Sequence, residues 1–259
     1  MKLLEVRDLS FSYDKMLVLK HIGFSLEAGA IYSILGSNGA GKSTLLGCLE
    51  GGLTPQKGSV MIDGGDLTRL SPGERARKIG FVAQSQTLPF DFLVRDYLVL
   101  GRAPHIGTFK TPGAGEYRIV DEVMAEMNIE YLASKSILRI SGGERQQVQI
   151  ARALVQEPRL ILMDEPANHL DYGNQIKILK LIIDLAKRGI AVVLTTHVPD
   201  HAMLLGGKTG ILDREGYLTT GETEKIITEE NLKLIYQTEL RMAYMEPVNR
   251  MVCAACNIR

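Results

Sequence analysis

The sequence predicts an α/β fold, in which helices connect the strands of a mixed sheet, and two patterns lead to this prediction. In the first, an apolar run at residues 31–35 leads through a glycine-rich stretch into a helix-capable segment at 44–49. In the second, apolar runs at 160–163 and 190–194 flank a helical pattern at about 173–188. Such apolar runs are typical of strands buried on both faces, so the second pattern predicts neighbouring parallel strands joined by a helix.

The N-terminal quarter carries strand patterns separated by short turns. Residues 9–13 alternate between apolar and polar side chains, which predicts a half-buried antiparallel strand. Further strands are predicted at residues 22–26, 31–35, 60–62 and 79–83, with a short capped helix at 71–78. We therefore expect an antiparallel β subdomain beside the glycine-rich stretch.

Strand patterns give way to helices and loops between about residue 85 and residue 157. After a loop at 107–115, one helical face carries the apolar residues Ile119, Val120, Val123, Met124 and Met127. This change predicts a helical subdomain inserted in the sheet. Another helix is predicted at residues 222–236, so we expect one domain at 1–240 and a tail without a clear pattern at 241–259.

Composition excludes several classes of partner. The 30 Lys and Arg residues balance 30 Asp and Glu residues, so no overall field draws the chain to nucleic acid or anionic lipid, and we expect no nucleic-acid partner. No apolar run approaches the roughly 20 residues of a membrane span, and residues 1–8 carry charges too early for a secretion signal. Only three cysteines occur, which agrees with a reducing compartment. We expect a cytoplasmic protein.

The glycine-rich stretch fits the phosphate-binding consensus G-x-x-x-x-G-K-[ST]. It consists of Gly36, Ser37, Asn38, Gly39, Ala40, Gly41, Lys42, Ser43 and Thr44. The glycines let backbone N–H groups approach the β- and γ-phosphates, and the following helix N-terminus adds further donors. Lys42 adds a positive charge, while the Ser43 hydroxyl is left to ligate Mg²⁺. The stretch predicts ATP or GTP binding; the alternative is a turn without a ligand.

A second motif lies where the apolar run at 160–163 ends in two carboxylates, Asp164 and Glu165. Asp164 could hold Mg²⁺ directly or through water, and Glu165 could polarise a water in line with the γ-phosphate. Many strands end in solvated acids, so this motif gains its meaning from the phosphate loop upstream.

A third motif begins a helix with Ser141, Gly142, Gly143 and Glu144. Ser141 and Glu144 have the spacing of a capping box, and in the simplest interpretation Glu144 only satisfies backbone donors. The two glycines destabilise a first turn by roughly 0.5–1 kcal/mol each relative to alanine. They are better explained if an anion must lie against bare backbone there.

Together and in this order, these motifs resemble those of the nucleotide-binding subunit of ATP-binding cassette (ABC) transporters, from residue 13 to about 236. The resemblance implies a P-loop NTPase-type ATPase with a RecA-like mixed sheet and the two subdomains expected above. It matches residues 36–43 to the Walker A motif, 160–165 to Walker B and 141–147 to the family signature, where ATP and Mg²⁺ bind.

Four further residues receive roles from the resemblance alone. Tyr13 matches the aromatic residue that stacks on adenine, and Gln84 matches the glutamine that senses Mg²⁺ and the membrane subunit. Asp171 belongs to the loop that crosses the dimer interface, and His197 matches the histidine that contacts the γ-phosphate. The alternatives are ordinary sheet packing for Tyr13, a solvated strand end for Gln84, a helix cap for Asp171 and a satisfied or exposed histidine for His197. His201 receives no role.

The signature departs from the family pattern, because Ile140 and Glu144 stand where the family most often has Leu and Gln. A carboxylate near a phosphate repels it unless the capping box turns the carboxylate back to the helix N-terminus. This departure bears on the turnover rate more than on the identity of the family.

The resemblance also implies partners. Two copies pair head to tail, so that each ATP lies between the Walker A motif of one copy and the signature of the other. ATP closes this homodimer and hydrolysis reopens it. Transmembrane permease subunits, and through them a substrate-binding protein, are the further partners, which places the chain on the inner face of the cell membrane.

A narrower resemblance concerns the transported substrate. Residues 94–105, 170–175 and 228–232 are similar to segments of ABC subunits that serve importers of iron–siderophores, haem, cobalamin and molybdate. The cargo itself is selected by other chains, so the sequence does not name it. The main rival is a soluble ABC ATPase of iron–sulfur assembly, whose signature also often carries Ser-Gly-Gly-Glu.

Two other classes of P-loop protein fit the sequence less well, and two cysteines in the tail have a spacing of their own. DNA-repair and translation ATPases usually need a coiled-coil insertion or tandem cassettes, which this chain lacks, and the signature and His197 argue against a P-loop kinase. Cys253 and Cys256 have metal-ligand or redox spacing. A second pair of ligands is missing nearby, so we favour a plain tail.

Overall fold

The computed structural model describes residues 2–84, 90–107 and 110–256. Its first sheet is antiparallel, with strand order β2-β1-β4-β5. These strands are β1 (Lys2–Tyr13), β2 (Met16–Glu27), β4 (Lys57–Ile62) and β5 (Gly65–Asp66). The predicted N-terminal antiparallel subdomain is therefore confirmed, with longer strands than the alternation alone indicated.

The second sheet is mixed and has the order β10-β9-β3-β8-β7-β6. Its strands are β3 (Ile31–Leu35), β6 (Ile79–Val82), β7 (Leu160–Met163), β8 (Ala191–Thr196), β9 (Lys208–Leu212) and β10 (Leu218–Glu222). All neighbours are parallel except β9 and β10. Every residue of β3, β7 and β8 is buried, as the continuous apolar runs predict. The carboxyl ends of these central strands meet at one edge, where the predicted motifs begin.

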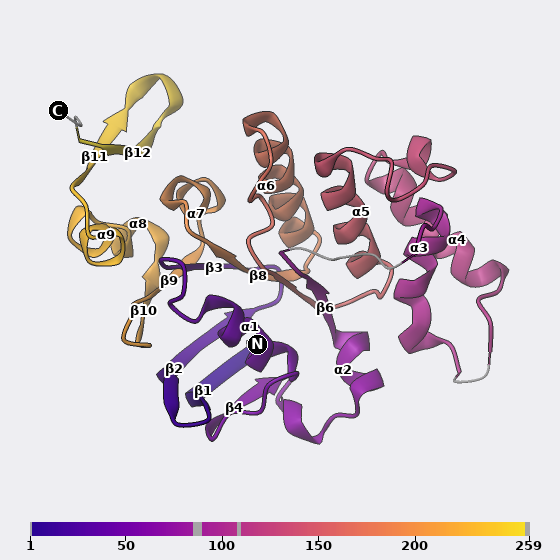
Figure 1. Cartoon of the computed structure of the whole chain (residues 1–259), viewed down its shortest axis with the longest axis horizontal. Helices are drawn as coiled ribbons and strands as arrows, with labels where there is room; N and C mark the ends of the chain where they lie inside the picture. Colours follow the sequence, from indigo (N-terminus) through magenta and orange to yellow (C-terminus); the bar gives the residue numbers. More distant parts are fainter. Residues whose placement is uncertain (1, 85–89, 108–109, 257–259) are drawn as a thin grey trace.

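Helices cover this sheet and stand beside it (Figure 1). Beside β6 lies a helical group that consists of α3 (Val94–Val99), the 3₁₀ segments η2 (Leu100–His105) and η3 (Glu130–Leu132), α4 (Ala114–Glu126) and α5 (Gly142–Leu154). The remaining helical elements are α1 (Lys42–Glu50), η1 (Leu67–Arg69), α2 (Pro72–Lys78), α6 (Tyr172–Lys187), α7 (Pro199–Leu205), α8 (Thr223–Ile226), α9 (Glu229–Tyr236) and η4 (Glu246–Val248). The α/β fold class with a mixed sheet and a helical group is confirmed.

The structure adds detail to the C-terminal part. The segment at 222–236 is helical, as predicted, but divides into two helices, because Ile227 is extended and the Thr228 side chain caps α9 by accepting a hydrogen bond from Asn231 N. The tail forms a hairpin of β11 (Leu240–Met245) and β12 (Arg250–Ala255). Both faces of this hairpin are partly exposed, so the alternation that marks a half-buried strand is weak in its sequence.

Within the residues that the structure describes, no helix is both long enough and apolar enough to cross a membrane. Part of the expected loop at 107–115 lies outside the described residues, and α4 already begins at Ala114. On α4, Val120, Val123 and Met124 are buried, so the predicted apolar face packs inward.

Candidate functional site

The loop between β3 and α1 has a backbone that requires glycine. Gly39 and Gly41 have φ angles of 82° and 100°, in the left-handed region that disfavours other residues. At Gly36, a Cβ would lie 2.7 Å from the carbonyl oxygen of Leu212, so a side chain there would collide with β9. Helix α1 begins at Gly41 without a side-chain cap. These features fit an anion, which the N–H groups of the first turn can bind.

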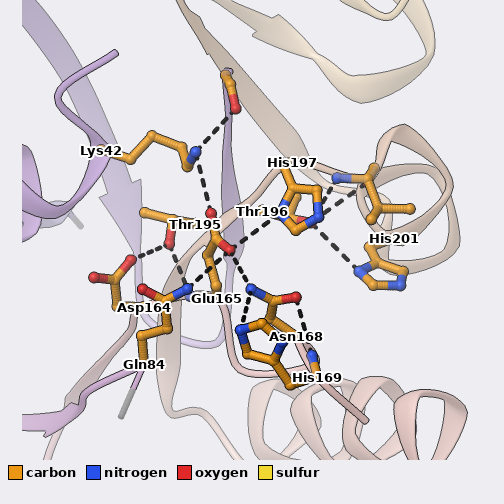
Figure 2. A network of polar contacts seen from close by, with 12 residues as sticks. Lys42, Gln84, Asp164, Glu165, Asn168, His169, Thr195, Thr196, His197 and His201 are labelled. Atoms are coloured by element: carbon orange, nitrogen blue, oxygen red, sulfur yellow. Dashed lines mark hydrogen bonds and ion pairs between the residues drawn. The ribbon is translucent and has the colours of Figure 1, made fainter. Parts of the chain in front are cut away.

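Lys42 is held at the centre of this loop although only 6% of its surface is exposed. Its Nζ donates to the carbonyl oxygens of Gly36 and Ser37, at 2.9 and 3.1 Å. The same atom lies 3.1 Å from Oε1 of Glu165, and both side chains of this ion pair are buried (Figure 2). The pair therefore joins the loop after β3 to the acidic end of β7.

Glu165 is the residue on which the other polar groups converge (Figure 2). Its Oε2 accepts hydrogen bonds from Asn168 Nδ2 at 2.9 Å and Gln84 Nε2 at 3.3 Å, and it lies 3.0 Å from His197 Nδ1. Glu165 itself has a φ of 46°, which is uncommon outside glycine and occurs often at functional sites. The structure thus brings together Lys42, Gln84, Glu165 and His197, which the sequence placed at one site.

Asp164 is buried and is oriented by a residue that the sequence reasoning missed. The Thr195 hydroxyl donates to Asp164 Oδ1 at 2.6 Å and accepts from the Glu165 N–H at 2.9 Å. One signal could have found it: β7 and β8 are parallel with Met163 opposite Leu194, so the residues that follow lie side by side. Thr195 therefore fixes the Asp164 carboxylate and the backbone of Glu165 at the end of β7.

The oxygen atoms near the loop fit Mg²⁺ rather than a softer metal. Ser43 presents an exposed hydroxyl, Asp164 a carboxylate and Gln84 an amide. Across the described ranges, no group of three or more His, Cys, Asp or Glu side chains could hold a metal ion. A Mg²⁺ ion at this place would need phosphate oxygens and water as its remaining ligands, which is how this ion is usually bound in nucleotide sites.

The start of α5 forms the predicted capping box. Ser141 N donates to Glu144 Oε2 at 2.8 Å, and Glu144 N donates to Ser141 Oγ at 3.3 Å. Hydrogen bonds to the carboxylate from the backbone and the side chain of Ser141 hold the pKa of Glu144 below its usual range, so the carboxylate stays ionised and turned back to its own helix. Its charge therefore points to the helix N-terminus, as the departure from the family pattern required.

The two glycines of this motif have different surroundings. At Gly143 a Cβ would lie 2.7 Å from the Asn174 side chain, so close packing against α6 explains this glycine. Gly142 is exposed, and the nearest atom to a Cβ added there would be a Leu170 carbon 4.0 Å away. Packing against Asn174 thus explains the glycine at position 143, whereas the exposed backbone of Gly142 is open to a ligand.

Three predicted residues lie apart from the cluster around Glu165. Tyr13 ends β1 with 47% of its surface exposed, and its ring packs edge-on against Phe11 with centroids 4.9 Å apart. Asp171 caps α6 by accepting from Asn174 N at 2.9 Å. Glu144, at the start of α5, has Lys135 as its ion-pair partner at 3.8 Å.

His201 is buried beside the site rather than in it. Its Nδ1 lies 3.3 Å from Thr196 Oγ1, and burial, followed by the nearby His197, lowers its pKa. This placement agrees with the absence of a predicted role.

A glycine loop between a buried strand and a helix, with its lysine paired to the acid that ends a neighbouring strand, defines a P-loop nucleotide-binding protein. The model of the ABC transporter family matches residues 19–168, which is more than half of the chain. The chain therefore belongs to the ABC transporter family, and it is a nucleotide-binding ATPase of that family.

Two relatives and one solved structure resemble nearly the whole chain. The molybdate import ATP-binding protein MolC of Haemophilus influenzae is 37% identical, over 91% of this chain and 88% of its own. A probable iron chelatin transport ATP-binding protein of Helicobacter pylori is 34% identical, over 97% of this chain and 99% of its own. A solved structure, described as an inward-facing conformation of a putative metal-chelate type ABC transporter, is 34% identical with a TM-score of 0.88. The match covers 99% of this chain and 98% of the chain in that structure.

Proposed function

We propose that this ATPase powers a membrane importer for a metal chelate, such as an iron–siderophore, haem or cobalamin, or for a molybdate-like oxyanion. The observation that carries the proposal is the similarity, along 91–99% of the chain, to an ATP-binding protein of molybdate import, to one of iron chelatin transport and to a transporter of the metal-chelate type. A similarity confined to residues 19–168 would support the family but no subgroup.

We infer that the working unit is a homodimer with two composite ATP sites. Within one chain, Ser141 and Glu144 bond to each other and Glu144 pairs with Lys135, whereas Lys42 pairs with Glu165. Helix α5 belongs to the helical group, while α1 lies between the two large sheets (Figure 1). Head-to-tail pairing of two copies would bring the exposed Gly142 backbone of one to the phosphate loop of the other.

In the proposed mechanism, the loop N–H groups and Lys42 hold the phosphates of ATP. Glu165 accepts the proton of the attacking water, because its carboxylate is held at the phosphate loop by Lys42 through Oε1 and is oriented by polar side chains at Oε2. His197 orients this carboxylate and contacts the γ-phosphate. Ser43, Asp164 and Gln84 would hold Mg²⁺, which neutralises phosphate charge when bound. Tyr13 stacks on the adenine with its exposed ring, and Asp171 lies at the dimer interface.

A permease would keep this subunit at the inner face of the membrane. We propose that the permease docks in a cavity of about 350 Å³ that is lined by residues of α1, α2, β6 and α5. This cavity lies between the central sheet and the helical group. The cavity contains Arg75, Arg152 and Glu50, and it extends to Val82 and Ala83 immediately before Gln84. A permease segment in this position could move Gln84 relative to Glu165, and so couple transport to hydrolysis.

The experiment that tests the importer proposal is a tagged pull-down at native expression from detergent-solubilised membranes, with partners identified by mass spectrometry. We expect a polytopic membrane protein at about one copy per copy of this chain, as closed symmetric assemblies require. Recovery in the soluble fraction with cytosolic iron–sulfur proteins would overturn the proposal in favour of iron–sulfur assembly.

A further inference from the structure

The C-terminal part of the chain reaches back to the residue that contacts Glu165. Tyr236, the last residue of α9, donates its hydroxyl hydrogen to the backbone carbonyl oxygen of His197 at 2.7 Å. We propose that Tyr236 is a positioning residue, which fixes the place of the His197 imidazole relative to Glu165. This inference rests on the proposed function, in which His197 and Glu165 act at the γ-phosphate.

The geometry leaves the His197 loop little freedom. His197 follows the end of β8, and its Nδ1 lies 3.0 Å from Glu165 Oε2. On one side of His197, Val198 N donates to Thr196 Oγ1 at 3.0 Å, which closes a tight turn around it. The Tyr236 hydroxyl then holds the carbonyl of His197 itself. Since the carbonyl and the imidazole share one Cα, a shift of the carbonyl displaces the imidazole.

Tyr236 is in turn held by what we name the C-terminal clasp, which consists of α9 and the β11–β12 hairpin. Glu229 at the start of α9 accepts from Met242 N at 2.8 Å and from the Arg241 guanidinium at 3.0 Å. Arg250 of β12 donates to Asp200 Oδ1 of α7 at 2.7 Å, with both side chains more than two-thirds buried. Within the clasp, the hairpin therefore contacts α9 through β11, and it contacts α7, which follows His197 in the chain, through β12.

The packing around Tyr236 agrees with this role. Its ring lies against the small apolar cluster that contains Leu35 and Ile211, where Met242 and Cys253 of the hairpin also pack. Burial raises the pKa of Tyr236, with smaller contributions from Cys253 and Glu165. The phenol therefore remains a hydrogen-bond donor at any physiological pH. Tyr236 thus packs in the same cluster as the hairpin and hydrogen-bonds to the residue that contacts Glu165, which is what a link between them requires.

The test is Tyr236→Phe in the full chain, which removes only the hydroxyl. The loss of one buried hydrogen bond in the catalytic arrangement should lower kcat roughly fivefold. We expect KM for ATP and nucleotide affinity to be unchanged, because Lys42 and the phosphate loop are untouched. The matched control is Tyr32→Phe: Tyr32 is more deeply buried than Tyr236 and also donates a 2.7 Å hydrogen bond, but to Thr220 on β10. Its kcat should equal that of the wild type.

A second readout does not depend on activity. The chain has five histidines, so the imidazole resonance of His197 can be assigned in ¹³C-histidine-labelled protein by comparison with His197→Gln. This resonance should shift in Tyr236→Phe and, to a smaller extent, in Arg250→Ala, which loosens the clasp without changing the tyrosine. It should not shift in Tyr32→Phe. An unchanged His197 resonance in both clasp variants would overturn the inference, even if Tyr236→Phe were too unstable for kinetics.

Variants of His197 and Tyr236 distinguish a failure of this inference from a failure of the proposed function. If His197→Ala lowers turnover while Tyr236→Phe keeps normal kcat and a normal His197 resonance, the inference is wrong and the proposed function stands. If His197→Ala leaves turnover unchanged, the proposed role of His197 is wrong and the inference is wrong with it. Equal losses of kcat in Tyr236→Phe and Tyr32→Phe would also contradict it, since that result reports general destabilisation.

Discussion

Replacing Glu165 by glutamine tests the chemistry of the site, because it preserves shape and removes one charge. The carboxylate pairs with Lys42 through Oε1 and accepts from Asn168 and Gln84 through Oε2. A glutamine has a single acceptor oxygen. It can therefore accept either from Lys42 or from the pair of Asn168 and Gln84, and it turns its NH₂ toward the partner that is left. The amide also cannot take a proton from water at neutral pH. We therefore expect Glu165→Gln to lose hydrolysis while the phosphate loop remains intact.

The magnitude follows from the role of a positioned base. General-base catalysis contributes about 10²–10⁴-fold, which corresponds to roughly 3–5 kcal/mol of activation free energy. Nucleotide binding should be preserved or tighter, because Lys42 no longer has a buried carboxylate competing for its charge. Kcat should therefore fall by this factor without a rise in the dissociation constant for ATP.

The assay combines steady-state phosphate release with equilibrium binding of a fluorescent ATP analogue. The matched control is Glu126→Gln, which makes the same change in a surface ion pair with Arg188, where Arg188 Nη2 donates to Glu126 at 2.9 Å. Turnover of that variant should stay within twofold of the wild type, as expected for exposed pairs worth about 0–1 kcal/mol. Near-normal turnover of Glu165→Gln would remove Glu165 from the role of base.

Three further changes probe the site and its support. Lys42→Ala should weaken nucleotide binding itself by tenfold or more, measured by the same analogue, because it deletes the buried cation of the loop; unaltered binding would contradict the phosphate-loop assignment. Thr195→Val should lower the free energy of unfolding by about 2 kcal/mol in urea titrations, since Asp164 and the Glu165 N–H lose their shared partner; a neutral result would refute it. The pKa of His201 is lowered in the folded chain. As the pH falls below about 6.5, the unfolded chain therefore protonates this histidine before the folded chain does, and the free energy of unfolding decreases. His201→Gln should flatten this dependence, whose slope is at most about 1.4 kcal/mol per pH unit, and an unchanged slope would show that His201 does not cause it.

Local patterns predicted local structure well. The strands at 31–35 and 160–163 were predicted with the bounds that the structure has. Continuous apolar runs that are bounded by glycine or an acidic residue leave little choice of where a strand begins and ends. The capping box of Ser141 and Glu144 was likewise predicted, since both of its hydrogen bonds form within four residues. Where one segment contains both partners of an interaction, the sequence is sufficient.

Interactions between distant segments were harder to predict. Thr195 looks like any β-branched residue in a buried strand until the pairing of β7 and β8 places it beside Asp164. The packing reason for the glycine at position 143 was not visible in the sequence, because its partner, Asn174, lies on another helix. The hairpin at the C-terminus was missed for the same reason: it is stabilised by contacts to α7 and α9 rather than by its own pattern.

The central claim is that each ATP site combines the phosphate loop of one copy with the signature of another, and mixing two inactive variants tests it most directly. Lys42→Ala disables the phosphate loop. Gly142→Asp disables the signature by placing a carboxylate at the exposed backbone; the position is open and its φ lies outside the left-handed region, so the fold accepts the side chain. An acidic residue in a first helical turn is also favourable for the helix.

Each variant alone should be inactive. In the mixture, half of the random dimers contain one of each and carry one intact site, so about a quarter of the wild-type ATPase activity should return. If the mixture stays inactive although both variants are folded and Gly142→Asp still binds ATP, or if Gly142→Asp alone keeps full turnover, the composite site is contradicted.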